Sequence, residues 1–291
     1  MGTSKGYGGP AGGLVPSFLN DPAPPVRPAP APAAPPPEPA APGAPAPQPP
    51  SAPPPQTAPP RPDTSGAGDF RGPRANFSRF ARTGSRTSLG SAVSGYVRSG
   101  TGGAGRAARR MGSSRAAARG LLGVVRDFQR LGPTETLRGL DLAGLAGRPA
   151  PDVFVAILEF ICPPGGAVDE AIARGAMLET IGDMAEAGVG SFDALTPAQM
   201  QEFFLDFVAR SIEGRVMADL GGRGVTLPDN IAAVENAQAQ LHDFVAGATR
   251  GQFIGRLDGV ERLSDRDIEA TVNQIYETAF ELIAAAGEAV A

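Results

Sequence analysis

The chain has 291 residues, of which 42% are hydrophobic, with one cysteine and no tryptophan. A single cysteine excludes a disulfide framework and indicates a reducing compartment. No apolar run approaches the ~18 residues of a membrane span, and the start lacks the charged and apolar regions of a signal peptide. We therefore expect a soluble, cytoplasmic protein.

The net charge of −4 conceals two regions of opposite sign. Residues 71–130 contain 13 arginines and one acid, whereas residues 131–291 contain 10 arginines and 25 acids. This asymmetry predicts that the basic segment either packs on the chain's own acidic surface or meets an anionic partner. Lysine occurs once, which can reflect genomic base composition, although arginine is also the better donor for carboxylate and phosphate.

The first zone, residues 1–20, begins MGTSKGYGGP and ends near the apolar stretch LVPSFL. Removal of the initiator methionine would expose the amine of Gly2, while Gly6 stands where a myristoylation motif needs Ser or Thr. An open amine on an unfolded peptide suits capture in a pocket of another protein, the alternative being a tail without a role. The expected modification and recognition residues are Gly2, Thr3, Ser4, Tyr7, Gly8, Gly9 and Pro10.

The second zone, residues 21–62, is a Pro/Ala-rich tether that holds 21 of the 31 prolines. Proline fixes φ and removes amide donors, so this stretch favours extended polyproline II and excludes helix and central strand. At about 3.1 Å per residue it reaches on the order of 100 Å. Its PxxP spacings also match SH3-type ligands, but a plain disordered spacer is the simpler interpretation.

The third zone, residues 63–101, mixes Gly, Ser and Arg with four scattered aromatic residues. This composition predicts a basic segment that is flexible or ordered only conditionally. We therefore place the start of the folded domain at residue 102. The aromatic residues are Phe70, Phe77, Phe80 and Tyr96.

The fourth zone, residues 102–291, shows helix after helix separated by Gly and Pro, which predicts an all-α bundle. The clearest helix starts at Thr196, where Pro197 suits the first position and Gln199 completes a capping box. Its apolar stripe comprises Met200, Phe203, Phe204, Phe207, Val208 and Ile212. No segment after residue 130 alternates with the period of a strand.

Other helices are predicted in the same way, including APDVFVAILEFI, which CPPGG stops, and AVDEAIARGAMLETIGDMAEAG, which ends at Gly188. A further helix runs between Arg106 and Leu131, and the last begins at Ser264. The stretch LPDNIAAVENAQAQLHDFVAGATRGQFIGRL predicts one more helix before the last. The inward-facing residues of the helix between Arg106 and Leu131 are Leu121, Val124, Val125, Phe128 and Leu131. Those of the additional helix are Ile231, Val234, Leu241, Phe244, Val245 and Ala248, and those of the last helix are Ile268, Val272, Ile275, Ala279 and Leu282.

Catalytic chemistry has few candidates in this sequence. Nucleophilic catalysis needs a base beside the nucleophile, and the only such pair is Cys162 with His242, both beside apolar helix residues. We interpret both as structural, and one Cys with one His does not suggest a zinc site. Five carboxylates on one helix could form a metal or acid–base site, but a solvated face or a dock for the basic segment is the plainer interpretation. They are Asp169, Glu170, Glu179, Asp183 and Glu186. We expect no catalytic residue, metal or cofactor.

The glycine-rich stretch GTGGAGRAARR, at the expected start of the helical domain, contains three arginines, and two more follow it. Helix N-termini bind anions readily, so phosphate or nucleic-acid contact is one interpretation. Pairing with the chain's own acidic helices is the favoured one. The residues expected to contact an anion or a partner are Arg106, Arg109, Arg110, Arg115 and Arg119.

Three stretches carry a resemblance to a known family: MGTSKGYGGPAGGLVPSFL, GGAGRAARRMGSSRAAARGLL and LAGRPAPDVFVAILEFICPPGGAVDEAIARGAMLET. They resemble QatB, a component of the four-protein Qat anti-phage defence system of bacteria. The resemblance implies three partners: a QatA-like ATPase, a QatC-like enzyme of the QueC family and a QatD-like nuclease of the TatD family. QueC relatives activate a carboxylate with ATP and give it an amine, so the resemblance implies that Gly2 could accept a deazaguanine-type group.

We therefore expect a non-enzymatic scaffold whose N-terminus is also the substrate of a QueC-like partner. The first alternative is an Arg-rich adaptor that uses residues 71–130 to bring the partner nuclease to phage DNA. The second is an enzyme built on the acidic helix. No membrane partner is expected.

Overall fold

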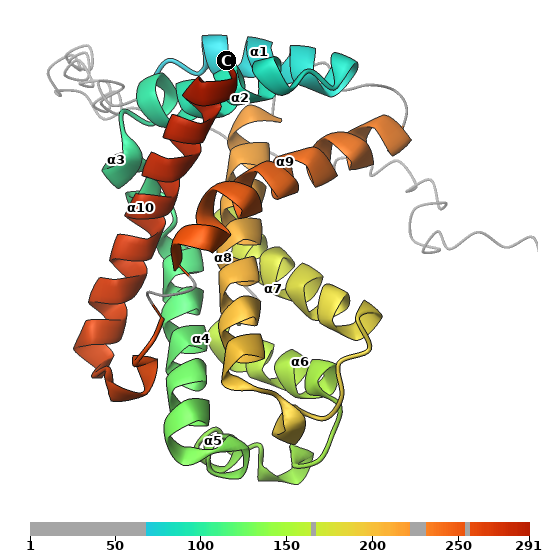
Figure 1. Cartoon of the computed structure of the whole chain (residues 1–291), viewed down its shortest axis with the longest axis vertical. Coiled ribbons are helices and arrows are strands. Elements are labelled where there is room, and N and C mark those ends of the chain that lie inside the picture. The colour runs from blue at the N-terminus through green and yellow to red at the C-terminus, as the bar shows by residue number, and fades with distance from the viewer. Residues whose placement is uncertain (1–67, 164–166, 222–230, 254–256) are drawn as a thin grey trace, which may run out of the picture. The chain divides into compact units, whose positions relative to one another are not determined.

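The computed structural model describes residues 68–163, 167–221, 231–253 and 257–291 (Figure 1). The chain divides into residues 1–59 and 60–291, and all described residues belong to the second part. The N-terminal peptide and the proline-rich tether therefore lie outside the described residues. The described ranges contain helices and no strand, which confirms the all-α fold class.

Ten α-helices are described, together with short 3₁₀ turns and one π-helical turn. The first four are α1 (Arg71–Thr83), α2 (Arg86–Gly95), α3 (Ala104–Arg109) and α4 (Gly112–Leu131), with the π turn η3 (Tyr96–Gly100) after α2. The others are α5 (Pro133–Gly139), α6 (Ala150–Ile161), α7 (Val168–Glu186), α8 (Pro197–Leu220), α9 (Ile231–Phe253) and α10 (Asp265–Val290).

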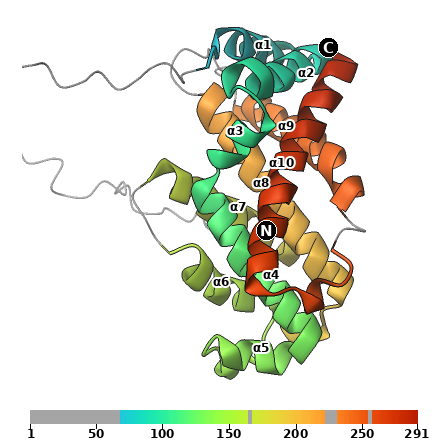
Figure 2. The same ribbon diagram turned by 90° about the vertical axis from the view of Figure 1, so that its left-hand side faces the viewer.

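The core forms where α4, α8 and α10 pack together, with α7 and α9 against α8 and α6 against α7 (Figures 1 and 2). All six residues of the predicted α8 stripe are buried. The Thr196 hydroxyl accepts a hydrogen bond from the Gln199 backbone N–H, and the Gln199 side chain accepts one from the Thr196 N–H, so the predicted capping box is confirmed. Ser264 caps α10 in the same way.

The inward stripes of the other helices are mostly buried as predicted. Leu131 is an exception at 50% exposure, because it is the last residue of α4 and the chain turns away at Gly132, whose φ is +84°. Leu282, Val234, Phe244 and Ala248 are half-buried, and the side chain of Ile231 lies outside the described set. The terminating glycine of α7 is confirmed, since Gly188 has φ +65°.

The start of the helical domain needs correction, because it lies at Arg71 and not near residue 102. Much of the segment expected to be flexible, residues 63–101, forms α1, α2 and η3. Phe77, Phe80 and Tyr96 have no exposed surface. The physical reason is that the buried residues of α1, Pro73, Phe77, Phe80 and Ala81, recur at helical spacing and give one apolar face.

Glycine in this segment permits close packing of helices. A Cβ atom added to Gly90 of α2 would lie 2.5 Å from the carbonyl oxygen of Gly287 in α10. A Cβ added to Gly287 would lie 2.7 Å from the carbonyl oxygen of Gly90. The two backbones therefore touch where α2 crosses α10, which any larger residue at either position would prevent.

The helix predicted between Arg106 and Leu131 is divided into α3 and α4. The chain leaves helical geometry at Met111, whose φ and ψ are −96° and 40° and whose side chain is fully buried. The Asp169 carboxylate of α7 accepts a hydrogen bond of 2.7 Å from the Ser113 N–H, one of the free amides at the start of α4. Tertiary contacts thus decide the break, and they are not visible in the local sequence.

Candidate functional site

The predicted recognition residues Gly2, Thr3, Ser4, Tyr7, Gly8, Gly9 and Pro10 lie outside the described residues, so their role stays a prediction. All five predicted anion-contact arginines are described, and the structure divides them into two groups. Arg106, Arg109 and Arg110 lie on or just after α3 and are exposed. Arg115 and Arg119 lie on α4.

The α3 group is only partly paired. Arg110 Nη2 lies 3.1 Å from Asp219 Oδ2, and its guanidinium also lies 5.7 Å from the ring centre of Phe70. Arg106 folds back toward Gly102, where an added Cβ would lie 2.8 Å from its Nη1. Among the described residues, neither Arg106 nor Arg109 has a carboxylate within 4.0 Å.

Three of the four arginines of α4 face polar groups of α10. Arg115 Nη1 donates to Asn273 Oδ1 at 2.7 Å, and Arg119 Nη1 donates to Glu269 Oε1 at 2.8 Å. Arg126, farther along, donates from Nη1 to Asp265 Oδ1 at 2.6 Å. We call Arg115, Arg119 and Arg126 the α4 row. Residues of α10 therefore bind all three arginines of the α4 row, and Figure 2 shows that α4 and α10 are neighbours.

Asp219, near the end of α8, joins the N-terminal elements α1, η3 and the end of α3 to α8. Its Oδ2 accepts from Tyr96 Oη at 3.0 Å, Arg110 Nη2 at 3.1 Å and Arg215 Nε at 3.2 Å. Its backbone carbonyl accepts from Arg74 Nε and Nη2 at 3.1 and 2.9 Å, which satisfies a free carbonyl at the helix end. Burial, and then Asp219, raise the pKa of Tyr96, so its hydroxyl keeps the proton that it donates.

Sequence reasoning missed Asp219 and Tyr96. Their separation along the chain is 123 residues, and no short motif reports a contact at that distance. The available signal was the charge asymmetry, which predicts arginine–acid contacts without naming the partners.

Three of the five predicted carboxylates of α7, Asp169, Glu179 and Asp183, contact arginines, whereas Glu170 accepts a hydrogen bond from the Ala167 N–H. Arg210 Nη1 lies 3.2 Å from Glu179 Oε2, its Nη2 contacts Asp183, and its Nε lies 3.0 Å from Asp206 Oδ2. Asp169 holds the Ser113 amide and lies 3.5 Å from Arg215 Nη1. Within the described ranges, no group of three His, Cys, Asp or Glu residues is arranged to hold a metal ion.

Cys162 and His242 have separate surroundings. Burial raises the pKa of the Cys162 thiol to about 11, and its carbonyl accepts from Arg174 Nη1 at 2.8 Å. His242 Nδ1 lies 3.1 Å from Oε2 of Glu213, a carboxylate that is only 2% exposed. That hydrogen bond raises the pKa of His242 and favours the imidazolium, which neutralises the buried carboxylate. Both contacts join elements of the bundle.

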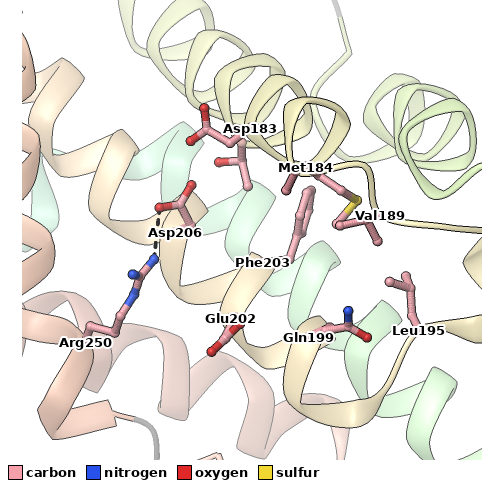
Figure 3. A pocket seen from close by; sticks show the side chains of 11 residues that line it. Asp183, Met184, Val189, Leu195, Gln199, Glu202, Phe203, Asp206 and Arg250 are labelled. Atoms are coloured by element: carbon pink, nitrogen blue, oxygen red, sulfur yellow. Dashed lines mark hydrogen bonds and ion pairs between the residues drawn. The ribbon is translucent and has the colours of Figure 1, made fainter.

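A cavity of about 310 Å³ opens between α7, α8 and α9 (Figure 3). Its lining combines apolar side chains, among them Met184 and Phe203, with the carboxylates of Asp183 and Asp206 and the guanidinium of Arg250. Arg250 Nη2 lies 3.4 Å from Asp206 Oδ1, and Arg210 holds both carboxylates. Asp183 and Asp206 are therefore paired with arginines, whereas Glu202, which also lines the cavity, has no ion pair among the described residues.

Comparison with known proteins gives one match. The model of the family described as QatB, Qat anti-phage system associated protein, matches residues 102–283. The chain belongs to the QatB family. No curated protein and no solved structure matches it. Family membership gives this QatB chain a role in the Qat anti-phage system, and the other Qat components are its expected partners.

The range matched to the QatB family covers only some of the described helices. It includes α3, α4 and most of α10, and with them the α4 row. It leaves out α1, α2 and η3, which the structure packs onto the same core. None of the helices in the described part of the chain is both long and apolar enough to cross a bilayer.

Proposed function

We propose that this QatB chain is a non-catalytic component of the Qat complex that acts both as scaffold and as substrate. The helical part holds the other components, an ATPase, a QueC-family enzyme and a TatD-family nuclease. The N-terminal peptide enters the active site of the QueC-family enzyme, where Gly2 after methionine removal is the acceptor. The tether of residues 21–62 gives that peptide its reach.

The observation that supports this role is the state of the reactive side chains in the helical part. Cys162 is a buried thiol with a raised pKa, and His242 is bound to the buried Glu213. The Tyr276 hydroxyl is buried at 2.8 Å from Ser211 Oγ. Each of these groups contacts another element of the bundle, whereas removal of Met1 would give Gly2, ahead of the tether, a primary amine with no side chain beside it.

The chemistry proposed for Gly2 is amide formation. The QueC-family partner activates the carboxylate of a deazaguanine precursor with ATP. The neutral Gly2 amine attacks the activated carboxyl carbon, an amide bond forms, the activating group leaves with the bonding electrons, and the nitrogen releases a proton. A terminal α-amine has a pKa near 7.7–8.0, so a useful fraction is neutral at physiological pH.

Intact-mass spectrometry of the chain co-expressed with the other components tests this proposal. We expect a mass increase on a chain that lacks Met1, located on Gly2 by fragmentation. Gly2→Glu, which blocks methionine removal, should abolish the increase, and Gly13→Glu in the same zone is the matched control that should keep it. An unmodified glycine terminus in the complete, phage-challenged system contradicts the proposal.

A second candidate function is a nucleic-acid adaptor that brings the nuclease to phage DNA. The observation that favours it is that several exposed arginines, including Arg79, Arg86 and Arg109, have no carboxylate within 4.0 Å among the described residues. Phosphate contacts release counterions, so binding to DNA should fall steeply with salt. A full chain that binds no DNA at low salt contradicts this function and leaves the Gly2 proposal intact.

A further inference from the structure

Four arginines form a surface that we call the basic ridge: Arg71, Arg79 and Arg82 on α1 and Arg86 at the start of α2. All four are exposed. Within the described ranges, none has a carboxylate oxygen within 4.0 Å of its guanidinium, in contrast to Arg119 and Arg126 of the α4 row. The only hydrogen bond that a ridge guanidinium makes to a described residue joins Arg82 Nε to the Ser78 carbonyl of the same helix, at 3.3 Å.

Helix geometry places these charges on one side of α1. At 100° per residue, Arg71, Arg79 and Arg82 lie within about 80° of one another around the axis. At 1.5 Å per residue they extend over about 16 Å. Arg86 lies past the turn at Gly84, at the start of α2, and the cavities beside Arg82 and Arg86 share Gln240 of α9. The opposite side of α1 is buried against the core. The helix therefore cannot rotate to reduce the repulsion between the ridge guanidinium groups.

The acids near the ridge do not neutralise it. The Asp69 carboxylate accepts from the backbone N–H of Arg71 at 3.0 Å, and Asp243 lines a small cavity with Arg86 without an ion pair. A neighbouring cavity of about 390 Å³ runs from Arg82 to the amide side chains of Asn236 and Gln240 on α9. Guanidinium groups beside neutral amide donors suit an anionic ligand.

We propose that the basic ridge binds the phosphate backbone of double-stranded nucleic acid without reading its sequence. This inference deepens the second candidate function: it assigns nucleic-acid contact to α1 and α2, outside the range matched to the family, and not to the α4 row. Arginine forms bidentate hydrogen bonds with phosphate, and phosphate contacts position a protein on a duplex without sequence information.

The chemistry of the ridge favours this partner over an acidic protein. The core of a protein interface needs large apolar or aromatic anchors, and the exposed large apolar residues of the described chain all lie outside α1 and α2. Single-stranded nucleic acid is bound through stacking on exposed aromatic rings. In α1 and α2 the aromatic residues Phe77 and Phe80 have no exposed surface, so a duplex is the better fit.

Fluorescence anisotropy with a labelled random-sequence DNA duplex tests the ridge in the full-length chain. The test variant replaces the ridge arginines by Gln. The control variant makes the same change in charge at four exposed arginines, each of which has an acid partner in the structure. These are Arg130, Arg138, Arg148 and Arg262. A third variant replaces Arg106 and Arg109. Thermal unfolding of all variants confirms that they fold.

We expect the ridge variant to bind the duplex at least about tenfold more weakly and its logarithmic salt slope to fall by about one for each arginine that contacts a phosphate. The control should stay within about twofold of the unchanged chain. Equal losses in both variants, a loss confined to the α3 variant, or tighter binding to a single strand than to the duplex would overturn the inference. No binding by the unchanged chain would overturn the adaptor function as well.

Discussion

The α4 row and the basic ridge come from one arginine-rich stretch of the sequence, yet their surroundings differ completely. Arg115, Arg119 and Arg126 meet Asn273, Glu269 and Asp265 in reverse order, because α4 and α10 run antiparallel. Arg82 and Arg86 of the basic ridge line cavities together with residues of α9, and none of the four ridge arginines has an acid within ion-pair distance in the described chain. What packs opposite an arginine therefore decides whether it serves the fold or remains available to a partner.

The largest effect should come from Asp219, which links the N-terminal helices to α8. Asp219→Ala removes the acceptor for Tyr96, Arg110 and Arg215 and leaves the buried Tyr96 hydroxyl without that partner. We expect the free energy of unfolding to fall by about 3 kcal/mol. Urea denaturation followed by circular dichroism measures this. A loss below about 1 kcal/mol would show that the N-terminal helices are held without Asp219.

The next effect concerns the crossing of α2 and α10. Gly287→Ala places a Cβ 2.7 Å from the Gly90 carbonyl oxygen, so we expect a loss of about 2 kcal/mol. Gly182→Ala on α7 is the matched control, because its Cβ meets nothing within 4 Å and alanine is the better helix former. Thermal unfolding should lower the Tm of the first variant and slightly raise that of the second. The reverse order contradicts the close crossing.

A smaller effect should depend on pH. The hydrogen bond to Glu213 raises the pKa of His242 above its ordinary 6.5, with Asp206 adding to the shift and Arg210 opposing it. The stabilisation is complete below the unfolded-state pKa near 6.5 and is lost as pH rises through the higher folded-state pKa. We expect about 1 kcal/mol less stability at pH 8 than at pH 6. His242→Gln should remove this difference, because the chain has one histidine.

The smallest effect compares the two arginine groups directly. Arg119→Ala breaks an exposed pair with Glu269 and should cost about 0.5 kcal/mol. Arg79→Ala on the ridge removes no ion pair and should change stability by less than about 0.5 kcal/mol, with a gain at low salt from reduced repulsion. A double-mutant cycle with Glu269→Ala should show coupling for Arg119 and none for Arg79. Coupling to Arg79 would contradict the division between the groups.

Local signals predicted the later helices well, and they failed for the first ones. The capping boxes at Thr196 and Ser264 and the stripe of α8 are set within one or two turns, so the sequence contains the whole pattern. In residues 71–100 the high Gly and Ser content led to the prediction of a flexible segment, although the spacing of Phe77 and Phe80 is that of a helix. Gly90 has a packing role, because its backbone touches that of Gly287 where α2 crosses α10. Gly287 lies too far along the chain for this contact to be predicted from the local sequence.

For the candidate site, too, the sequence predicted the kind of contact but not the residues that depend on tertiary packing. Charge asymmetry predicted that the arginines would meet either the chain's own acids or an anionic partner, and the α4 row includes contacts of the first kind. It could not predict which arginines stay unpaired, because that depends on the packing of α1, α2 and α9. Asp219 gives no local signal, since its partners come from η3, from Arg110 after α3 and from within α8 itself.

Protection of cells against phage tests most directly the claim that the first residues act on a partner while the helical part serves as scaffold. Cells carry the complete Qat system with residues 2–10 of this chain deleted, and the matched control deletes the nine residues 31–39 of the tether instead. We predict that plating of phage rises to the level of cells without the system in the first case and stays low in the second, with equal Tm values for both chains. Full protection by the chain without residues 2–10 would contradict the account.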